Sequence, residues 1–208
     1  MRFNHADANY TFAPSLAGTL AVIHDGPGTT NLTGTNPYTG ATTVNAGVLN
    51  INNISATSAI TVNAGGTLGV PAGITGTTLG NYAQDATGTF RTLIANNTTY
   101  GRLVVNGTVN MTGNARIDVQ VSDCGAITPG TVFAGVIASS NAIGAVSFIV
   151  SDNCPGLIFT ARLNGNAVDL LAEAPRLIPT LSDWGMFLLG GLLALSALVA
   201  LRRRAIPL

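Results

Sequence analysis

A five-residue repeat is the feature that most limits how this chain of 208 residues can fold. The sequence Thr43-Val44-Asn45-Ala46-Gly47 returns 18 positions later as Thr61-Val62-Asn63-Ala64-Gly65. A short, fixed period of this kind is typical of a solenoid, in which each coil stacks on the one before and buries a continuous core. We therefore expect the repeat to mark equivalent points of two successive coils.

Alternating strands lie on both sides of this repeat. Ile117, Val119 and Val121 alternate with Asp118 and Gln120, a period of two that predicts a strand with one buried face. Similar runs, separated by Gly, Asn and Thr, are Leu49 with Ile51, Ile60 with Val62, Leu103 with Val105 (followed by the tight-turn pair Asn106-Gly107), Phe148 with Val150, Leu157 with Phe159, and Val168 with Leu170. A β-sandwich also fits short strands at this spacing. The repeat favours a right-handed parallel β-solenoid.

The composition indicates a polar but largely uncharged domain with a real core. Apolar residues make up 47% of the chain and charged residues 9%, and the chain has no lysine. Residues 1–183 carry six arginines against nine acidic residues, a balance of −3. Nucleic-acid binding requires basic patches, so no nucleic-acid partner is expected.

The C-terminal segment differs from everything before it. Residues 184–201 contain no charged side chain, and as a helix they would span roughly 27 Å at about 1.5 Å per residue. This length is close to the ~30 Å hydrocarbon core of a bilayer. Arg202, Arg203 and Arg204 follow at once, and the positive-inside rule places them in the cytoplasm. We therefore predict one transmembrane α-helix, with the preceding residues outside the cytoplasm.

A short motif precedes this apolar run. It consists of Ile178, Pro179, Thr180, Leu181 and Ser182, followed by Trp184 and Gly185. With the apolar helix and the arginine cluster, the motif resembles the IPTL-CTERM sorting signal of exported proteins of Gram-negative bacteria; Asp183 stands where that signal usually has Glu or Gln. The resemblance implies recognition by an exosortase-type membrane transpeptidase, cleavage nearby, and release or transfer of the ectodomain.

A second resemblance covers the repeat itself. Residues 28–36 read GTTNLTGTN and residues 38–49 read YTGATTVNAGVL. This pattern is similar to the autotransporter-associated β-strand repeat, which occurs in the passenger β-helices of large surface proteins. The similarity is strongest over residues 28–69 and looser over residues 81–171, where it implies the last coils of such a passenger.

Two cysteines, Cys124 and Cys154, are expected to form a disulfide in an exported chain, with two buried free thiols as the alternative.

The N-terminal sequence MRFNHADANYTFAPSL lacks the apolar region of a secretory signal. We therefore expect an export signal further upstream, in a longer protein; insertion directed by the C-terminal helix is the alternative.

Sequence motifs for catalysis are absent. Neither HExxH nor GxSxG occurs, and a chain without lysine has no P-loop. His5 and His24 are expected to be surface or turn residues. Sugar-cleaving enzymes need paired carboxylates, whereas the aspartates here are scattered in sequence, at Asp85, Asp118, Asp123, Asp152 and Asp169. We expect no catalytic residue, metal or cofactor.

These observations divide the chain into a β-solenoid domain (residues 1–171), a linker (172–177) and a sorting tail (178–208). We expect an exported, adhesin-like surface protein whose partners are the exosortase-type transpeptidase, the bilayer, and surface glycans or neighbouring proteins. The precursor would lie in the inner membrane with its ectodomain in the periplasm, and the product at the cell surface or outside the cell. A carbohydrate-active β-helix enzyme and an unprocessed single-span membrane protein are the alternatives.

Overall fold

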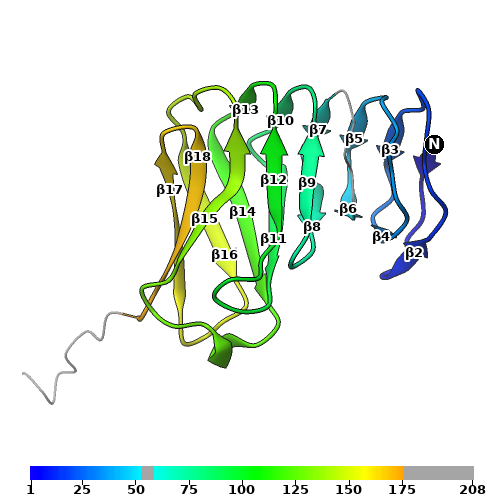
Figure 1. The fold of residues 1–208 in the computed structure, drawn as a ribbon. Coiled ribbons are helices and arrows are strands. Elements are labelled where there is room, and N and C mark those ends of the chain that lie inside the picture. Colours follow the sequence, from blue (N-terminus) through cyan, green and yellow to red (C-terminus); the bar gives the residue numbers. More distant parts are fainter. Residues whose placement is uncertain (53–58, 176–208) are drawn as a thin grey trace, which may run out of the picture. The chain divides into compact units, whose positions relative to one another are not determined.

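The computed structural model of the chain describes residues 1–52 and 59–175 (Figure 1). Within these ranges the regular elements are strands β1 to β18 and one short 3-10 turn, η1 (Cys124–Ala126). The strands form three sheets, called A, B and C below. The predicted membrane helix at 184–201 lies outside the described residues, and no helix within the described ranges is long and apolar enough to cross a bilayer.

Sheet A is parallel throughout and has six strands. Its order is β1 (Arg2–Phe3), β3 (Val22–His24), β5 (Thr42–Val44), β7 (Ile60–Val62), β10 (Tyr82–Gln84) and β13 (Val109–Met111).

Sheet B is also parallel and has seven strands. Its order is β2 (Tyr10–Phe12), β4 (Thr29–Leu32), β6 (Gly47–Ile51), β8 (Gly66–Val70), β11 (Thr89–Ile94), β14 (Asn114–Val121) and β16 (Ser147–Asp152).

Sheet C is mixed and has five strands. Its parallel part is β9 (Thr75–Thr78), β12 (Arg102–Val105) and β15 (Val132–Ser139). Strands β18 (Ala167–Glu173) and β17 (Ile158–Asn164) continue the sheet in antiparallel pairing.

The chain visits the sheets in turn, so that each circuit forms one coil. The first circuits contribute one strand to sheet A and one to sheet B, and from β7 onward a strand of sheet C follows. The two copies of the sequence repeat lie on adjacent coils, with Thr43 paired to Thr61 and Val44 to Val62. The period therefore measures one coil, as predicted. The fold is mainly β, and its parallel sheets are compatible with a β-solenoid.

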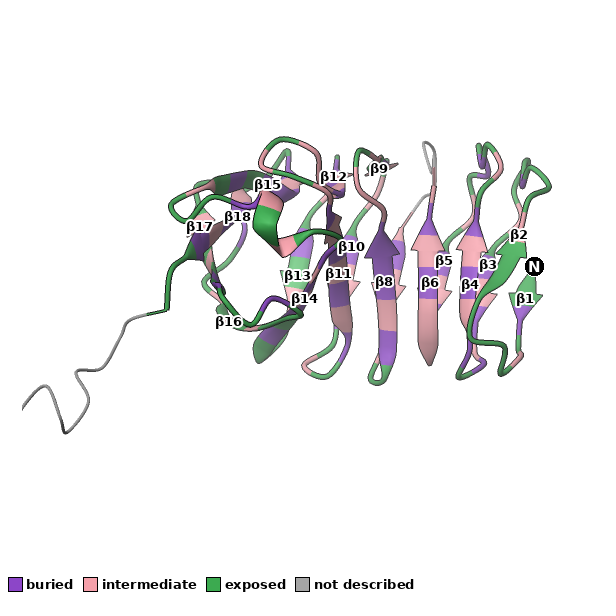
Figure 2. Cartoon of the chain, turned by 90° about the horizontal axis from the view of Figure 1, so that it is seen from below, coloured by how far each residue is buried: buried purple, intermediate pink, exposed green. Residues whose placement is uncertain are grey.

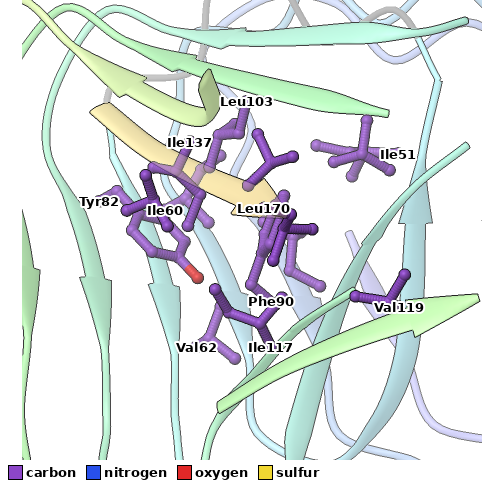
Figure 3. Close-up of a cluster of buried hydrophobic side chains, with 14 of the residues drawn as sticks. Ile51, Ile60, Val62, Tyr82, Phe90, Leu103, Ile117, Val119, Ile137 and Leu170 are labelled. Carbon is purple, nitrogen blue, oxygen red and sulfur yellow. The ribbon is translucent and has the colours of Figure 1, made fainter. Parts of the chain in front are cut away.

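The core is a set of columns in which each coil places an apolar side chain on that of the coil before. In sheet B one column runs through Leu49, Leu68, Phe90 and Ile117, which pair in register and are at most 1% exposed. Along β4 and the second half of β6 buried residues alternate with partly exposed ones, whereas β8 is buried at every position but Thr67 (Figure 2). Figure 3 shows columns from all three sheets meeting in one core. Each such side chain contributes about 1.5–3 kcal/mol on full burial.

The last strands depart from the coil pattern. Strand β18 runs antiparallel to β15, and their pairing shifts register between Phe133 and Ile137. At this irregularity Gly135 has a φ of 61° and its N–H donates to the buried carboxylate of Asp169 at 2.8 Å. Strand β18 extends to Glu173, two residues into the segment predicted as a linker. The stack therefore ends in an antiparallel hairpin.

Glycines at the corners let the backbones of neighbouring coils come close together. At Gly101, which precedes β12, a Cβ atom would lie 2.0 Å from the carbonyl oxygen of Val70. A side chain there would force two backbones apart, because the obstacle is a main-chain atom that cannot rotate away. Gly156, in contrast, has open space around it.

We predict that Gly101→Ala lowers the free energy of unfolding by about 1–3 kcal/mol, the usual cost of overpacking. Gly156→Ala is the matched control and should change it by less than about 0.5 kcal/mol, as for most surface substitutions. Urea unfolding of both variants measures the difference. Equal stability of the two would show that the coils are not packed this closely at the corner.

Candidate functional site

A ladder of amide side chains follows one corner of the stack, where the strands of sheet A end. Asn45 donates through Nδ2 to Asp25 Oδ1 at 2.5 Å, and Asn63 donates to Asn45 Oδ1 at 2.6 Å. Arg2 forms an ion pair with the other oxygen of Asp25. The hydrogen bond from Asn45, with the guanidinium of Arg2, holds the pKa of Asp25 below its ordinary value. We call this row the corner ladder.

The backbone sets the positions of the corner ladder. The N–H of Asn45 donates to His24 O at 2.8 Å, that of Asn63 to Val44 O at 2.9 Å, and that of Asp85 to Val62 O at 2.9 Å. Each of these residues directly follows a strand of sheet A, so one coil places its side chain above the next. Asp85 is therefore the next rung after Asn63.

A groove of about 280 Å³ opens beside this end of the corner ladder. Its lining residues come from β7, β10, β13 and the turns that follow them: Thr61, Asn63, Ala83, Gln84, Asp85, Asn110 and Thr112. Asp85 is the only charged residue of this lining. The groove therefore offers hydroxyl, amide and carboxylate groups among the apolar atoms of its lining.

A second ladder crosses the outer face of sheet B. Asn31 donates to Asn9 Oδ1 and Asn50 donates to Asn31 Oδ1, both at 2.7 Å. The next position in register is Gly69, where a Cβ would lie 1.9 Å from Asn50 Oδ1. This oxygen is buried and has no hydrogen-bond partner within the described residues. The second ladder thus ends in a closed space, whereas the corner ladder ends at a groove.

Two histidines and a threonine form a polar cluster inside the first coils. Thr30 Oγ1 lies 2.8 Å from His5 Nε2 and 3.1 Å from His24 Nε2. His24 Nδ1 lies 2.8 Å from Ala46 O, and the N–H of Asp7 donates to His5 Nδ1 at 3.2 Å. The assignment of both histidines as surface or turn residues was wrong for His24, which is fully buried.

The cluster satisfies each polar atom only when both rings are neutral. His24 then donates from Nδ1 to Ala46 O and accepts at Nε2 from the hydroxyl of Thr30, which in turn accepts from His5 Nε2. Burial lowers the pKa of His24 below its ordinary value of 6.5; the bond to Ala46 O opposes this shift, and the nearby His5 adds to it. The sequence could have indicated that His24 is buried, because His24-Asp25 aligns with Val44-Asn45 in the next coil and Val44 is an apolar position of the repeat.

The scattered aspartates make separate local contacts. Asp118 pairs with Arg91 at 2.6 Å and accepts from Gln120 at 2.8 Å. Asp123 accepts from the N–H of Gly125 and Asp152 from that of Cys154, each at 2.9 Å. Within residues 1–52 and 59–175, no group of three or more His, Cys, Asp or Glu side chains could hold a metal.

Cys124 and Cys154 are joined by a disulfide in the structure. It ties η1, which follows β14, to the turn after β16. In the same region the side chain of Asn153 bonds both the N–H and the C=O of Val121, at 2.8 and 2.9 Å. These links hold the end of β16 against β14. The expected sorting residues 178–182, 184 and 185 and the arginines 202–204 lie outside the described residues.

Comparisons with known proteins point to the same two segments as the sequence. The passenger-associated-transport-repeat family matches residues 24–51, and the IPTL-CTERM motif matches residues 178–204. The adhesin BmaC autotransporter of Brucella suis biovar 1 (strain 1330) is 51% identical over 71 residues, which cover 33% of this chain and 2% of that relative. The chain thus spans a small part of that relative. Both resemblances are confirmed, and together they support a surface-exposed, adhesin-like protein.

The histidine cluster predicts that acid weakens the fold. Because the pKa of His24 is lower in the folded than in the unfolded state, the unfolded chain takes up more protons as the pH falls through 6.5. Stability should therefore be full above pH 6.5 and fall below it, until the lowered folded pKa is reached. Urea unfolding at pH 7.5 and pH 5.0 measures this loss.

His24→Val is the informative variant, because Val44 and Val62 occupy the same column in the next two coils. It should be less stable at pH 7.5, since Ala46 O and Thr30 lose a partner, yet lose less stability than the parent chain between pH 7.5 and 5.0. An unchanged pH dependence would show that His24 is not the responsible group.

Proposed function

We propose that this chain is an exported, adhesin-like structural element that is presented at the bacterial surface after recognition of its C-terminal motif by an exosortase-type transpeptidase. The match of the IPTL-CTERM motif to residues 178–204 carries this proposal, because it joins a sorting signal to a passenger-type coil stack. A right-handed β-solenoid is the architecture that suits the described parallel sheets.

The coil stack itself supports a structural rather than a catalytic role. Its polar surface is arranged in bonded ladders, and the aspartates bind neighbouring backbone and side-chain groups instead of converging on one point. The adhesin relative and the passenger repeat also favour a structural role. In this role the protein acts by presenting a rigid surface to glycans or neighbouring proteins.

Sorting would proceed in two steps. The apolar run 184–201 would hold the precursor in the inner membrane, with residues 202–204 in the cytoplasm and the coil stack in the periplasm. The transpeptidase would then recognise residues 178–182 with Trp184 and Gly185, and cut nearby. The stack would leave the inner membrane without its anchor.

The intact mass of the protein tests this sequence of events. We expect the form recovered from the outer membrane or the medium of the native host to lack the residues from near Trp184 onward. Pro179→Ala with Trp184→Ala should keep the full-length mass and remain in the inner membrane, whereas Pro155→Ala, a matched change in an exposed turn, should be processed normally. A full-length parent protein confined to the inner membrane would contradict sorting and leave a simple single-span anchor.

A further inference from the structure

The groove beside the corner ladder owes its shape to one small residue. On the outer face of sheet A, Ala83 lies in register between Thr61 on one side and Asn110 on the other. The preceding coil carries Thr43 at the same position. The methyl group of Ala83 therefore leaves a hollow in a row of larger polar side chains, and the corner ladder forms one wall of it.

The corner ladder runs in one direction. Each asparagine donates toward the N-terminal end, from Asn63 to Asn45 and from Asn45 to Asp25, where a carboxylate accepts and ends the row. Asn45 turns its Oδ1 toward the following rung, where the amide of Asn63 meets it. Because the amide of Asn63 is fixed in the same way, we expect its Oδ1 to face the following rung, Asp85.

The row of side-chain hydrogen bonds in the corner ladder therefore cannot continue at Asp85. A carboxylate has no proton to donate to Asn63 Oδ1. Asp85 Oδ1 accepts from the N–H of Ala86 at 2.6 Å, and Thr112 Oγ1 donates to Gln84 O at 3.4 Å. Both residues line the groove, and among the described residues no hydrogen bond joins the amide oxygen of Asn63 or the second carboxylate oxygen of Asp85 to a donor.

A ligand that satisfies these two acceptors must bring hydrogen-bond donors. An anion would meet two acceptors and no basic side chain in the lining. A calcium ion takes six to eight oxygen ligands, usually from several carboxylates, and here one carboxylate is present. A sugar ring carries adjacent hydroxyl groups that can donate to both acceptors, while Thr61 and Asn110 offer further polar contacts at the rim.

We propose that this groove binds a hydroxyl-rich, uncharged sugar unit of a polysaccharide, with Asn63 and Asp85 accepting hydrogen bonds from its hydroxyl groups. The inference rests on the proposed surface role, since only a displayed groove meets glycans. Binding is measured on the purified chain, so it fails or succeeds independently of sorting. With no aromatic side chain in the lining, single-site binding is weak, and many copies on one surface would act together.

The Asp85→Asn variant distinguishes an effect on ligand binding from an effect on the stability of the corner ladder. Its amide would donate to Asn63 Oδ1 and complete the row, as Asn63 does for Asn45, while its Oδ1 keeps the bond from Ala86. The variant should therefore unfold at a temperature equal to or above that of the parent chain and yet bind sugar at least about tenfold more weakly, as expected for loss of a charge-assisted hydrogen bond. Asp123→Asn is the charge-matched control and should bind like the parent.

A second variant tests the hollow without touching the acceptors. Ala83→Thr introduces the residue that Thr43 and Thr61 hold in the same row, so the fold should tolerate it. Its larger side chain should fill the groove and weaken binding. Agreement between the two variants would place the sugar in this groove.

The experiment is saturation-transfer difference NMR on the full chain in detergent micelles, titrated with cellotetraose, maltotetraose, chitotetraose and mannotetraose. We expect at least one of the four to bind, and both groove variants to weaken it. No signal from any of them, or equal binding by the parent and Asp85→Asn, would overturn the proposal. So would calcium binding detected by calorimetry that requires Asp85 in the absence of a sugar effect.

Discussion

Backbone hydrogen bonds between parallel strands of successive coils are the interaction on which the rest of this structure depends. A parallel pair keeps one register along its whole length, so each residue lies directly over its equivalent one coil earlier. This is why Leu49, Leu68, Phe90 and Ile117 form a single buried column and why Asn45 and Asn63 can bond side chain to side chain. A slip of one residue would turn each apolar column outward. Core and surface order thus have the same cause.

The polar ladders add direction to this order. An asparagine amide has both donor and acceptor, so a row of them can bond end to end, and the residue after the row decides what its last oxygen meets. Over Gly69 that oxygen is enclosed, whereas at Asp85 it faces a groove. Inside the stack, the cluster of His5, His24 and Thr30 follows the same logic, since its bonds close only with neutral rings. On such a scaffold, the positions that depart from the repeating residue type determine where groups are left for a ligand or for protons.

Much of the fold could be predicted from the sequence, because the repeat marks equivalent points of two successive coils and alternation indicates the buried face. The exceptions could not. Asn106-Gly107 turns the chain from sheet C to sheet A, with the N–H of Gly107 bonded to Gly80 O, whereas Asn164-Gly165 closes the hairpin between β17 and β18. Both turns contain the dipeptide Asn-Gly. Whether it forms a turn between two sheets or a hairpin depends on which strand is available for pairing. The groove at Ala83 was likewise hidden, because it arises from side chains one coil apart and from the direction of the amides, which sequence spacing does not contain.

Spin-label distances test the in-register parallel stack most directly. Ile23 and Asn110 lie in one outward row of sheet A, separated by the coils of Thr43, Thr61 and Ala83. Because the two native cysteines are joined, nitroxides would attach only at Ile23→Cys and Asn110→Cys. An in-register parallel stack predicts a single narrow distribution centred near four strand spacings, about 19 Å between backbones. A broad distribution, or a separation several spacings larger, would contradict the parallel coil stack.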